Sequence, residues 1–448
     1  MKPLLRHQND ALAFLRRRGW RGALFMEPGL GKTRVGLEAA RRARRTIVVA
    51  PLNPAMFVWP AQHREWARDL SFALVRGSPK ERARILFDQK PDVAVLNYDL
   101  VHWLYDEVAA RRKLPYDLLI LDESTAVKSP SSVTFRALRA LEPAFDAVIP
   151  MTGTPAENSL HDLWGQLWFV DRGESLGKRI GVFRERYCSP VVRENYTTWK
   201  VTRAQDLRRD AAPLCFVRRA TDCLDMPPLI FSDVVFDLTP AERRFYETTR
   251  KHCIVELPDE PFTLANAGVA LDKLRQITSG FVYDEERVAH VIEHVPSKIR
   301  ALEEAVDEAF GRPILVGFWY QGSKRLIQAA FPNAPAIDRF TPPREKERLF
   351  AAWSRGELPI LLGQVKTIAL GMNMQSPDAS VIFYDMPWSH GQHWQFIRRI
   401  WRQGQATKVV VRRLIARHTV DGYVASVLKR KQQAEDELLT TILEKELI

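Results

Sequence analysis

The stretch Ala23-Leu-Phe-Met-Glu-Pro-Gly-Leu-Gly-Lys-Thr33 decides the first half of the fold. Its first four residues are an uninterrupted apolar run of the kind that forms a short buried strand. Residues 34–42 follow with a helical pattern. Strand, glycine-rich loop and helix in this order predict a phosphate-binding loop. Met26 stands where the generic pattern has its first glycine, so a glycine-rich turn with a chance lysine is the alternative interpretation.

The residue types inside this loop suit a nucleotide triphosphate. Gly29 and Gly31 let backbone N–H groups close around phosphates. Lys32 can reach the β- and γ-phosphates, and Thr33 can hold Mg²⁺. The amino terminus of the following helix adds partial positive charge. The loop therefore predicts ATP and Mg²⁺ as cofactors.

A second apolar run, Leu118-Leu-Ile-Leu, ends in the two carboxylates Asp122 and Glu123. Both are expected at the carboxyl end of a buried strand, where open α/β sheets bind their ligands. Asp122 would bind Mg²⁺, directly or through water, and Glu123 would polarise an attacking water molecule. Two acids after a strand are commonly a solvated loop, but a phosphate-binding loop upstream weakens that alternative.

Strand-like and helix-like segments alternate in two parts of the chain, which predicts α/β folding with parallel, doubly wound sheets. Residues 1–172 form the first predicted lobe and residues 297–427 the second. Between them, residues 173–296 have a charged sequence with a helical pattern that prolines interrupt, and they are expected to be a mostly helical connector. Residues 428–448 are expected to form a carboxyl-terminal helix. The expected strands are Ala23–Met26, Thr46–Ala50, Val93–Asn97, Leu118–Asp122, Ala147–Met151, Ile314–Phe318, Ile360–Leu362, Ser380–Tyr384 and Val409–Ile415.

The amino-acid composition limits which class of protein this chain can form and which kind of partner it favours. Among 448 residues, Lys and Arg total 66 against 54 for Asp and Glu, so the net charge is +12. A basic balance favours a polyanionic partner, although many basic proteins have none. No apolar run approaches the about 18 residues that a membrane span needs. Charged residues interrupt the amino-terminal stretch, so no signal peptide is expected and the protein is expected in the cytoplasm.

The four cysteines match no zinc pattern, and reduced thiols are expected.

In the second lobe, the segment Gln395–Gln405 carries Arg399 and Arg402, which would share one face if the segment is helical. Arginines from a second lobe can stabilise charge on the γ-phosphate of ATP held by a first lobe. A basic helix that faces solvent or DNA is the alternative.

In their order, these segments resemble superfamily-2 helicases, and most closely the Swi/Snf-type branch of double-stranded DNA translocases. Leu5-Arg-His-Gln8 is similar to the adenine-reading glutamine motif, so the resemblance implies that Arg6 and Gln8 contact the nucleotide. Thr152-Gly-Thr154-Pro is similar to motif III, and Asn97-Tyr98 to the end of motif Ib. The resemblance implies nucleic-acid or coupling roles for Asn97, Thr152 and Thr154.

The resemblance continues through the second half of the chain. Gly371-Met-Asn373 is similar to motif V, Trp388 to the segment before motif VI, and Gln395 with Arg399 and Arg402 to motif VI itself. It implies nucleotide contacts for Gly371 and Arg402, a catalytic role for both arginines, and nucleic-acid or coupling roles for Trp388 and Gln395. Thr419-Val-Asp421 matches a short trailing signature.

Several positions depart from the family pattern. Thr125 stands where a histidine is usual, and Ile368 and Ala369 replace a glycine pair. Ser389 and His390 replace Asn-Pro, and His393 replaces an acidic residue. These departures concern contacts with DNA more than ATP chemistry.

Together the motifs imply two RecA-like lobes with ATP in the cleft between them, working as a minimal motor of bacterial or phage type on double-stranded DNA with little sequence specificity. Two rivals remain. A strand-separating DNA or RNA helicase would carry the same motifs. A nucleotide-gated binding module with little turnover would also bind ATP, although Lys32, Asp122 and Glu123 together favour turnover.

Overall fold

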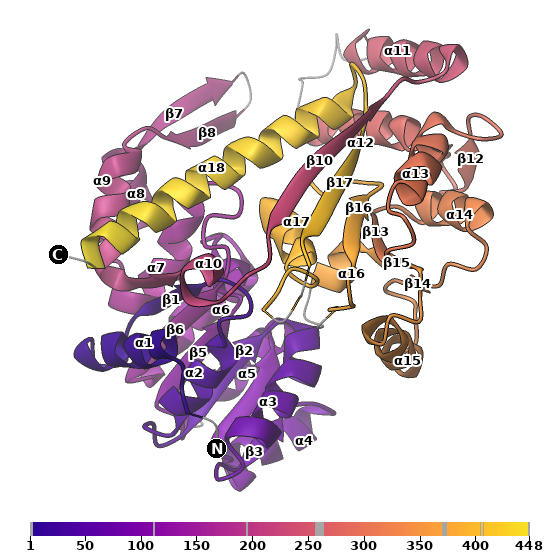
Figure 1. The fold of residues 1–448 in the computed structure, drawn as a ribbon. Helices are drawn as coiled ribbons and strands as arrows, with labels where there is room; N and C mark the ends of the chain where they lie inside the picture. The colour runs from indigo at the N-terminus through magenta and orange to yellow at the C-terminus, as the bar shows by residue number, and fades with distance from the viewer. Residues whose placement is uncertain are drawn as a thin grey trace. The chain divides into compact units, whose positions relative to one another are not determined.

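The computed structural model describes residues 3–110, 113–193, 196–255, 264–369, 374–403, 405 and 407–446. The chain divides into two compact units, each built on a parallel sheet (Figure 1). Unit 1 comprises Met1–Val191, Thr197–Leu224 and Lys431–Ile448, and unit 2 comprises Val192–Tyr196 and Asp225–Arg430. The expected α/β class with two doubly wound parallel sheets is confirmed.

Unit 1 contains a sheet of seven strands among the described residues, in the order β3-β4-β2-β5-β6-β1-β9. Every neighbouring pair is parallel, so all carboxyl ends lie along one edge of the sheet. The strands are β1 (Ala23–Met26), β2 (Thr46–Ala50), β3 (Phe72–Leu74), β4 (Val93–Asn97), β5 (Leu118–Asp122), β6 (Ala147–Thr152) and β9 (Cys215–Arg218).

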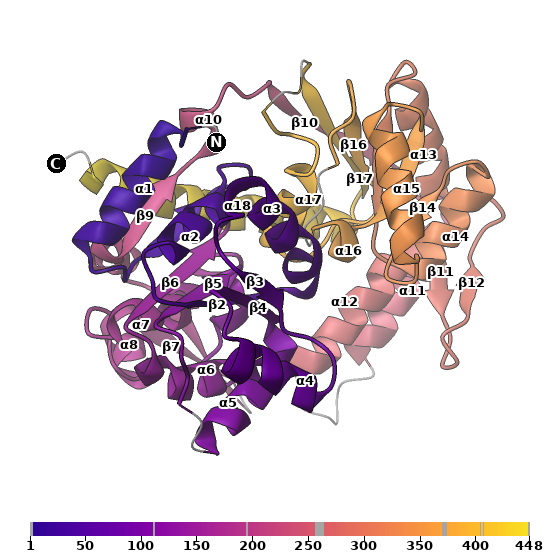
Figure 2. The same cartoon turned by 90° about the horizontal axis from the view of Figure 1, so that it is seen from below.

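Helices cover both faces of this sheet because its strands are apolar on both sides. On one face Leu119 and Leu121 join a core with α5, α6 and α7. On the other face α1, α2 and α3 lie side by side (Figure 2), and Gly36 of α2 brings its backbone close to Trp59 and Ile120. The helices assigned to unit 1 are α1 (Arg6–Arg17), α2 (Lys32–Ala40), α3 (Trp59–Trp66), α4 (Pro79–Ala83), α5 (Val101–Ala109), α6 (Val133–Leu141), α7 (Leu163–Asp171), α8 (Ile180–Tyr187), α9 (Ala204–Ala211) and α10 (Ala220–Cys223).

Unit 2 contains a sheet of six strands among the described residues, in the order β10-β17-β16-β13-β15-β14, again with only parallel pairs. Two apolar clusters cover its two faces. The strands are β10 (Leu229–Phe236), β13 (Ile314–Phe318), β14 (Ala336–Ile337), β15 (Ile360–Gln364), β16 (Ser380–Phe383) and β17 (Val409–Ala416). The helices are α11 (Pro240–Val255), α12 (Leu264–Thr278), α13 (Ser297–Asp307), α14 (Gln321–Ala330), α15 (Pro343–Ser354), α16 (Val365–Ala369), α17 (His390–Ile397) and the first part of α18 (Val420–Glu446).

The boundaries expected from the sequence differ from those of the compact units. Residues 173–296 are not a separate helical connector, because β9 pairs with β1 in the first sheet and β10 pairs with β17 in the second. Apart from the short segment Val192–Tyr196 assigned to unit 2, the units divide after Leu224 and, inside α18, after Arg430, whereas the sequence predicts boundaries at residues 172, 296 and 427. Two short strand pairs also lie in this region, β7 (Cys188–Arg193) with β8 (Tyr196–Val201) and β11 (Phe281–Tyr283) with β12 (Ala289–Val291).

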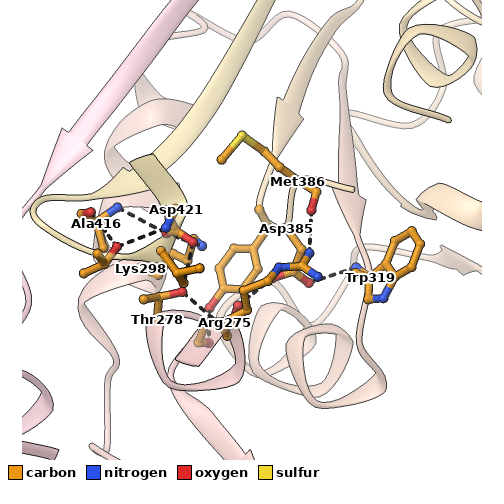
Figure 3. Close-up of polar contacts among 12 residues, drawn as sticks. Arg275, Thr278, Lys298, Trp319, Asp385, Met386, Ala416 and Asp421 are labelled. Carbon is orange, nitrogen blue, oxygen red and sulfur yellow. Dashed lines mark hydrogen bonds and ion pairs between the residues drawn. The ribbon is translucent and has the colours of Figure 1, made fainter. Parts of the chain in front are cut away.

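A buried polar network fixes the start of α18 in unit 2 (Figure 3). The ammonium of Lys298 lies 3.0 Å from Asp421 Oδ2, and their side chains are 2% and 6% exposed. The other carboxylate oxygen of Asp421 accepts from the hydroxyl of Thr278 at 3.0 Å, and Oδ2 also accepts from the backbone N–H of Ala416 at 3.2 Å. Asp421 therefore joins α12, α13 and β17 to α18, which gives the trailing Thr-Val-Asp signature a structural role.

Removal of Asp421 should destabilise the protein strongly, because it leaves the ammonium of Lys298 buried without a counter-charge. For Asp421→Ala we expect a loss of about 3–5 kcal/mol in the free energy of unfolding, measured by urea denaturation with circular dichroism. Asp307→Ala, which changes an exposed carboxylate on α13, is the matched control. A loss within about 0.5 kcal/mol of the control would contradict the assigned role.

Candidate functional site

The loop between β1 and α2 has the backbone that a phosphate ligand requires. Gly29 and Gly31 have φ angles of +95° and +76°, which side-chain-bearing residues rarely adopt. Gly31 is the N-cap of α2 and has no side chain to cap it. The first N–H groups of α2 therefore point into the loop, where they and the helix dipole favour an anion.

Lys32 and Thr33 lie in the first turn of α2, which begins two residues earlier than the sequence predicts. The ammonium of Lys32 donates to the carbonyl of Met26 at 2.7 Å, across the loop. Met26 is the last residue of β1, is fully buried, and does not have a positive φ. The position thus requires no glycine, which explains this departure from the generic pattern.

The motif at the start of α1 supports the same loop. The side-chain amide of Gln8 donates to the carbonyl of Leu30 at 3.2 Å, and the ring of His7 lies 3.1 Å from the same oxygen. A Cβ atom at Gly31 would lie only 2.4 Å from the amide nitrogen of Gln8. Gln8 thus requires a glycine at position 31, and His7 is a loop contact that sequence reasoning did not single out.

A cavity of about 680 Å³ lies beside this motif. Arg6, which is exposed, lines it together with His7, Asp10, Arg218 and Cys223. Burial lowers the pKa of His7, against the hydrogen bond to Leu30, so the ring is neutral at physiological pH. The cavity therefore offers two guanidinium groups, a neutral ring and two carboxylates next to the phosphate-binding loop.

The predicted carboxylate pair occupies the end of β5. Asp122 is 6% exposed and accepts a hydrogen bond from the indole N–H of Trp59 at 2.8 Å. Burial first, and then the charge of Glu123, raise the pKa of Asp122 to about 6. A buried carboxylate that is disfavoured in its charged form gains most from a bound cation. Trp59, which the sequence analysis does not single out, is thus a direct partner of the predicted metal ligand.

Glu123 has a φ of +50°, the left-handed region that a residue with a side chain rarely occupies. Its carboxylate accepts from the hydroxyl of Thr152 at 3.0 Å. Thr152 ends β6, and its hydroxyl also accepts from the backbone N–H of Thr154 at 3.2 Å. The predicted catalytic carboxylate is therefore joined to both threonines of the motif that follows β6.

The sheet order brings these groups together. β6 lies between β5 and β1, with Asp122 opposite Met151 and Phe25 opposite Thr152. The carboxyl ends of three neighbouring strands thus carry the carboxylates, the threonine motif and the phosphate-binding loop. Asn97 ends β4, which is separated from β5 by β2. Its amide donates to Asp99 at 2.8 Å, and it lines a separate cavity of about 230 Å³ with Arg76 and Arg82 among others.

The segment that carries the two arginines predicted in unit 2 is helical only in its first part, so the condition for a shared helix face is not met. α17 ends at Ile397, and Arg399 and Arg402 lie in the turns that follow it, whereas Gln395 is on the helix. The chain turns because Met374 donates its N–H to the carbonyl of Arg399 at 3.1 Å and Arg402 donates through Nε to the carbonyl of Arg398 at 2.8 Å. Burial first, and then Arg398, lower the pKa of Arg402 to about 10, so it remains charged at neutral pH.

Arg398 is a residue of this segment that sequence reasoning missed. It is 1% exposed, and its guanidinium lies 5.0 Å from the ring of Trp394 and 4.1 Å from that of Trp401. The available signal was a tryptophan four residues before Arg398 and another three residues after it. The predicted nucleotide contact Gly371 lies outside the described residues.

Trp388 lies within the polar network of unit 2. Asp385, three residues earlier, accepts from the backbone N–H of Trp319 at 2.8 Å and from the hydroxyl of Ser279 at 2.6 Å (Figure 3). The guanidinium of Arg275 donates to the carbonyl of Met386 and lies 5.4 Å from the ring of Trp388. Arg275 of α12 therefore holds the half-buried indole of Trp388 in place. A role of Trp388 in coupling would depend on this packing.

Among the helices that the structure describes, none is both long enough and apolar enough to cross a membrane.

Comparison with protein families gives two matches that together cover most of the chain. Residues 7–279 match the SNF2-related domain, and residues 297–404 match the helicase conserved C-terminal domain. The first match includes the phosphate-binding loop, the carboxylate pair and the threonine motif. The second includes Trp388, Gln395 and both predicted arginines.

The chain is also similar to individual proteins of phage and bacteria. The chain is 29% identical to putative protein p41 of Acyrthosiphon pisum secondary endosymbiont phage 1, over 98% of this chain and 97% of the relative. It is 25% identical to the putative ATP-dependent helicase/translocase YwqA of Bacillus subtilis, over 98% of this chain but 49% of the relative. The chain thus spans nearly all of the phage protein and about half of the bacterial one.

A solved SWI2/SNF2 ATPase core from Sulfolobus solfataricus, in complex with dsDNA, aligns over 100% of this chain and 95% of that structure, with 20% identity and a TM-score of 0.45. Since the SNF2-related match alone covers more than half of the sequence, the chain belongs to the SNF2-related family, the Swi/Snf-type branch of the superfamily-2 helicase-like ATPases.

Proposed function

We propose that this protein is a DNA-dependent ATPase that couples ATP hydrolysis to movement along duplex DNA, or to remodelling of protein–DNA complexes. One observation carries the proposal. At the carboxyl ends of the strands of the first sheet, a phosphate-binding loop with Lys32 lies beside the buried Asp122 and the half-buried Glu123, which is held by Thr152. A module that only binds nucleotide has no need for a carboxylate held in a strained backbone conformation.

ATP with Mg²⁺ fits the residues present. The N–H groups around Gly29 and Gly31 and the ammonium of Lys32 would hold the phosphates, and the cavity beside Arg6 and Gln8 would receive the base. The raised pKa of Asp122 reports a buried carboxylate that lacks sufficient counter-charge, which suits a divalent cation. Asp122 and the hydroxyl of Thr33 would hold the ion, which neutralises phosphate charge when bound.

Glu123 would orient and deprotonate the attacking water. A general base needs a fixed position within hydrogen-bonding reach of its proton. The hydroxyl of Thr152 supplies part of that fixation, and because Thr154 contacts the same hydroxyl, movement of the threonine motif would move the base. We propose this link as the route by which nucleic acid bound near the motif alters hydrolysis.

Arg399 and Arg402 would complete the reaction by stabilising charge on the γ-phosphate. Arginine suits this role because its guanidinium is a rigid fork of donors. Supply of this group from unit 2 would make hydrolysis depend on the arrangement of the two units, which is how a motor converts hydrolysis into movement.

Duplex DNA is supported as the partner by the family and by the charge of the chain. A net charge of +12 favours a polyanion, and Arg76, Arg82 and Asn97 lie around one cavity near the carboxyl ends of β3 and β4. Basic and amide groups of this kind contact phosphates without reading the base sequence. Trp388 and Gln395 are proposed to act in the same coupling from unit 2.

The proposal is tested by ATPase rates with no polymer, single-stranded DNA, duplex DNA and RNA, followed by displacement assays. Duplex DNA should stimulate most, and the protein should release a third strand from a DNA triplex without separating the duplex. The DNA concentration for half-maximal stimulation should rise steeply with salt, because phosphate contacts release counterions. Glu123→Gln, which should bind ATP without turnover, is the control. Lack of stimulation by any polymer would refute the proposal, and separation of duplex strands would favour a helicase.

Arg402→Ala should leave ATP binding nearly intact and reduce DNA-stimulated hydrolysis by about 10³-fold or more, the range typical of arginine fingers. Lysine should not restore the rate, because it offers a point charge without the fork. Binding of labelled ATP and steady-state hydrolysis at saturating duplex would be measured, with Arg325→Ala, an exposed arginine on α14, as control. If Arg402 only grips DNA, saturating duplex will restore full turnover and the proposed role is wrong.

Asp122→Asn should abolish hydrolysis and yet stabilise the ligand-free protein. A carboxyl whose folded-state pKa is raised from 3.8 to about 6 destabilises the fold above that pH, and the penalty disappears as pH falls below the unfolded value. We expect a gain on the order of 3 kcal/mol at pH 8 that fades towards pH 4, measured by urea denaturation. Asp307→Asn should show no such gain. A gain that persists at pH 4 would exclude desolvation of Asp122 as its cause.

A further inference from the structure

Another hollow in unit 1 lies at the amino-terminal ends of the strands of the first sheet, opposite to the nucleotide site. Its volume is about 890 Å³. Segments that immediately precede β2, β4 and β5 line it, as do α4 and a π-helical turn at Arg84–Gln89. Because the strands are parallel, these segments mark the amino edge, about 16 Å from the carboxyl edge for strands of five residues. Neither the proposed ATP site nor Asn97 reaches it.

The hollow is strongly basic. Six cationic side chains and two carboxylates, Asp88 and Glu107, line it. Within the described part of the chain, Arg44, Lys80, Arg84 and the other cations of this set form no ion pair with an acidic residue. The cations are Arg44, Arg45, Lys80, Arg84, Lys90 and Lys113.

Local structure maintains this concentration of charge. Both carboxylate oxygens of Asp117 accept from the backbone N–H groups of Arg44 and Arg45, at 3.0 and 2.9 Å, which fixes the segment before β2. Lys90 ends the π-helical turn with a φ of +50° and accepts from Arg45 Nε through its carbonyl at 2.9 Å. π-helical turns are rare and recur at functional sites, and left-handed residues with side chains store strain there.

The walls between the charges are apolar. Ala83 and Leu114 are buried, and Pro79 and Pro115 complete the lining. A ligand that fills this hollow would gain from burial of an apolar group as well as from its negative charge.

We propose that this hollow binds an acidic segment of a partner protein that carries an apolar side chain among its carboxylates. Charge complementarity requires an acidic ligand, and the apolar walls require an apolar group within it. Duplex DNA fits less well, because a convex cylinder cannot fill a hollow and phosphates gain nothing from Ala83, Leu114 or the prolines. The site is independent of the proposed motor function.

The test uses the full chain and a fluorescent twelve-residue peptide of glutamates and aspartates with two central leucines. Lys80→Glu with Arg84→Glu reverses two exposed charges of the hollow, and Arg16→Glu with Arg17→Glu is the matched control on exposed residues of α1. Loss of two ion pairs should weaken peptide binding by about tenfold or more. Replacement of the peptide leucines by serines should also weaken it. Duplex-stimulated ATPase of both variants should stay within about twofold of the parent.

Thermal unfolding establishes that each variant is folded, and Lys80→Gln with Arg84→Gln gives a milder version if charge reversal unfolds the protein. Weakening by the hollow variant alone, together with dependence on the leucines, supports the proposal. Three outcomes overturn it: no peptide binding at low salt, equal loss with the control variant, or displacement of the peptide by duplex DNA whose own affinity falls in the hollow variant. The last outcome would assign the hollow to nucleic acid.

Discussion

The parallel pairing of β6 with both β5 and β1 is the constraint on which the candidate nucleotide site depends. With Asp122 opposite Met151 and Phe25 opposite Thr152, three strands end at one level. Carboxylates, threonines and the phosphate-binding loop extend from those ends. A shift of one residue in either register would turn the side chain of Asp122 or Thr152 to the other face of the sheet. The apolar contacts of the strands, which prevent such a shift, therefore also fix the chemistry.

The site is built from groups that folding alone would not favour. Asp122 is charged at a buried position, Glu123 occupies a left-handed conformation, and Gly29 and Gly31 are fixed where glycine loses much conformational freedom. Each of these features opposes stability, and each would serve the proposed binding of a phosphate chain and a cation. The surrounding sheet, buried on both faces, supplies the stability that the site lacks.

Unit 2 handles buried charge in a different way. Lys298 and Asp421 neutralise each other, Asp385 is satisfied by Trp319 and Ser279, and Arg398 lies against two tryptophans. These arrangements join α12, α13 and α18 to the sheet and hold the segment that carries Arg399 and Arg402. The proposed catalytic arginines therefore lie on turns whose position depends on packing rather than on a regular helix.

The sequence by itself determined the local elements and the chemistry at their ends. Every strand expected from an apolar run is present within two residues of its predicted bounds, because a short run buried on both faces is visible without knowledge of its neighbours. The phosphate-binding loop and the carboxylate pair were predictable for the same reason, since each follows such a run directly.

Only the tertiary structure decided which strands share a sheet and which distant side chains meet. β9 and β10 lie at sheet edges with one strand partner each, and β10 is partly exposed. The sequence pattern therefore does not distinguish either strand from the predicted connector. Trp59 reaches Asp122, and the cations of the basic hollow converge from three separate segments, through pairings far apart in the sequence. Such contacts follow from the order of the strands in the sheet. That order depends on how each unit as a whole buries its apolar surface, and no short stretch of sequence reveals it.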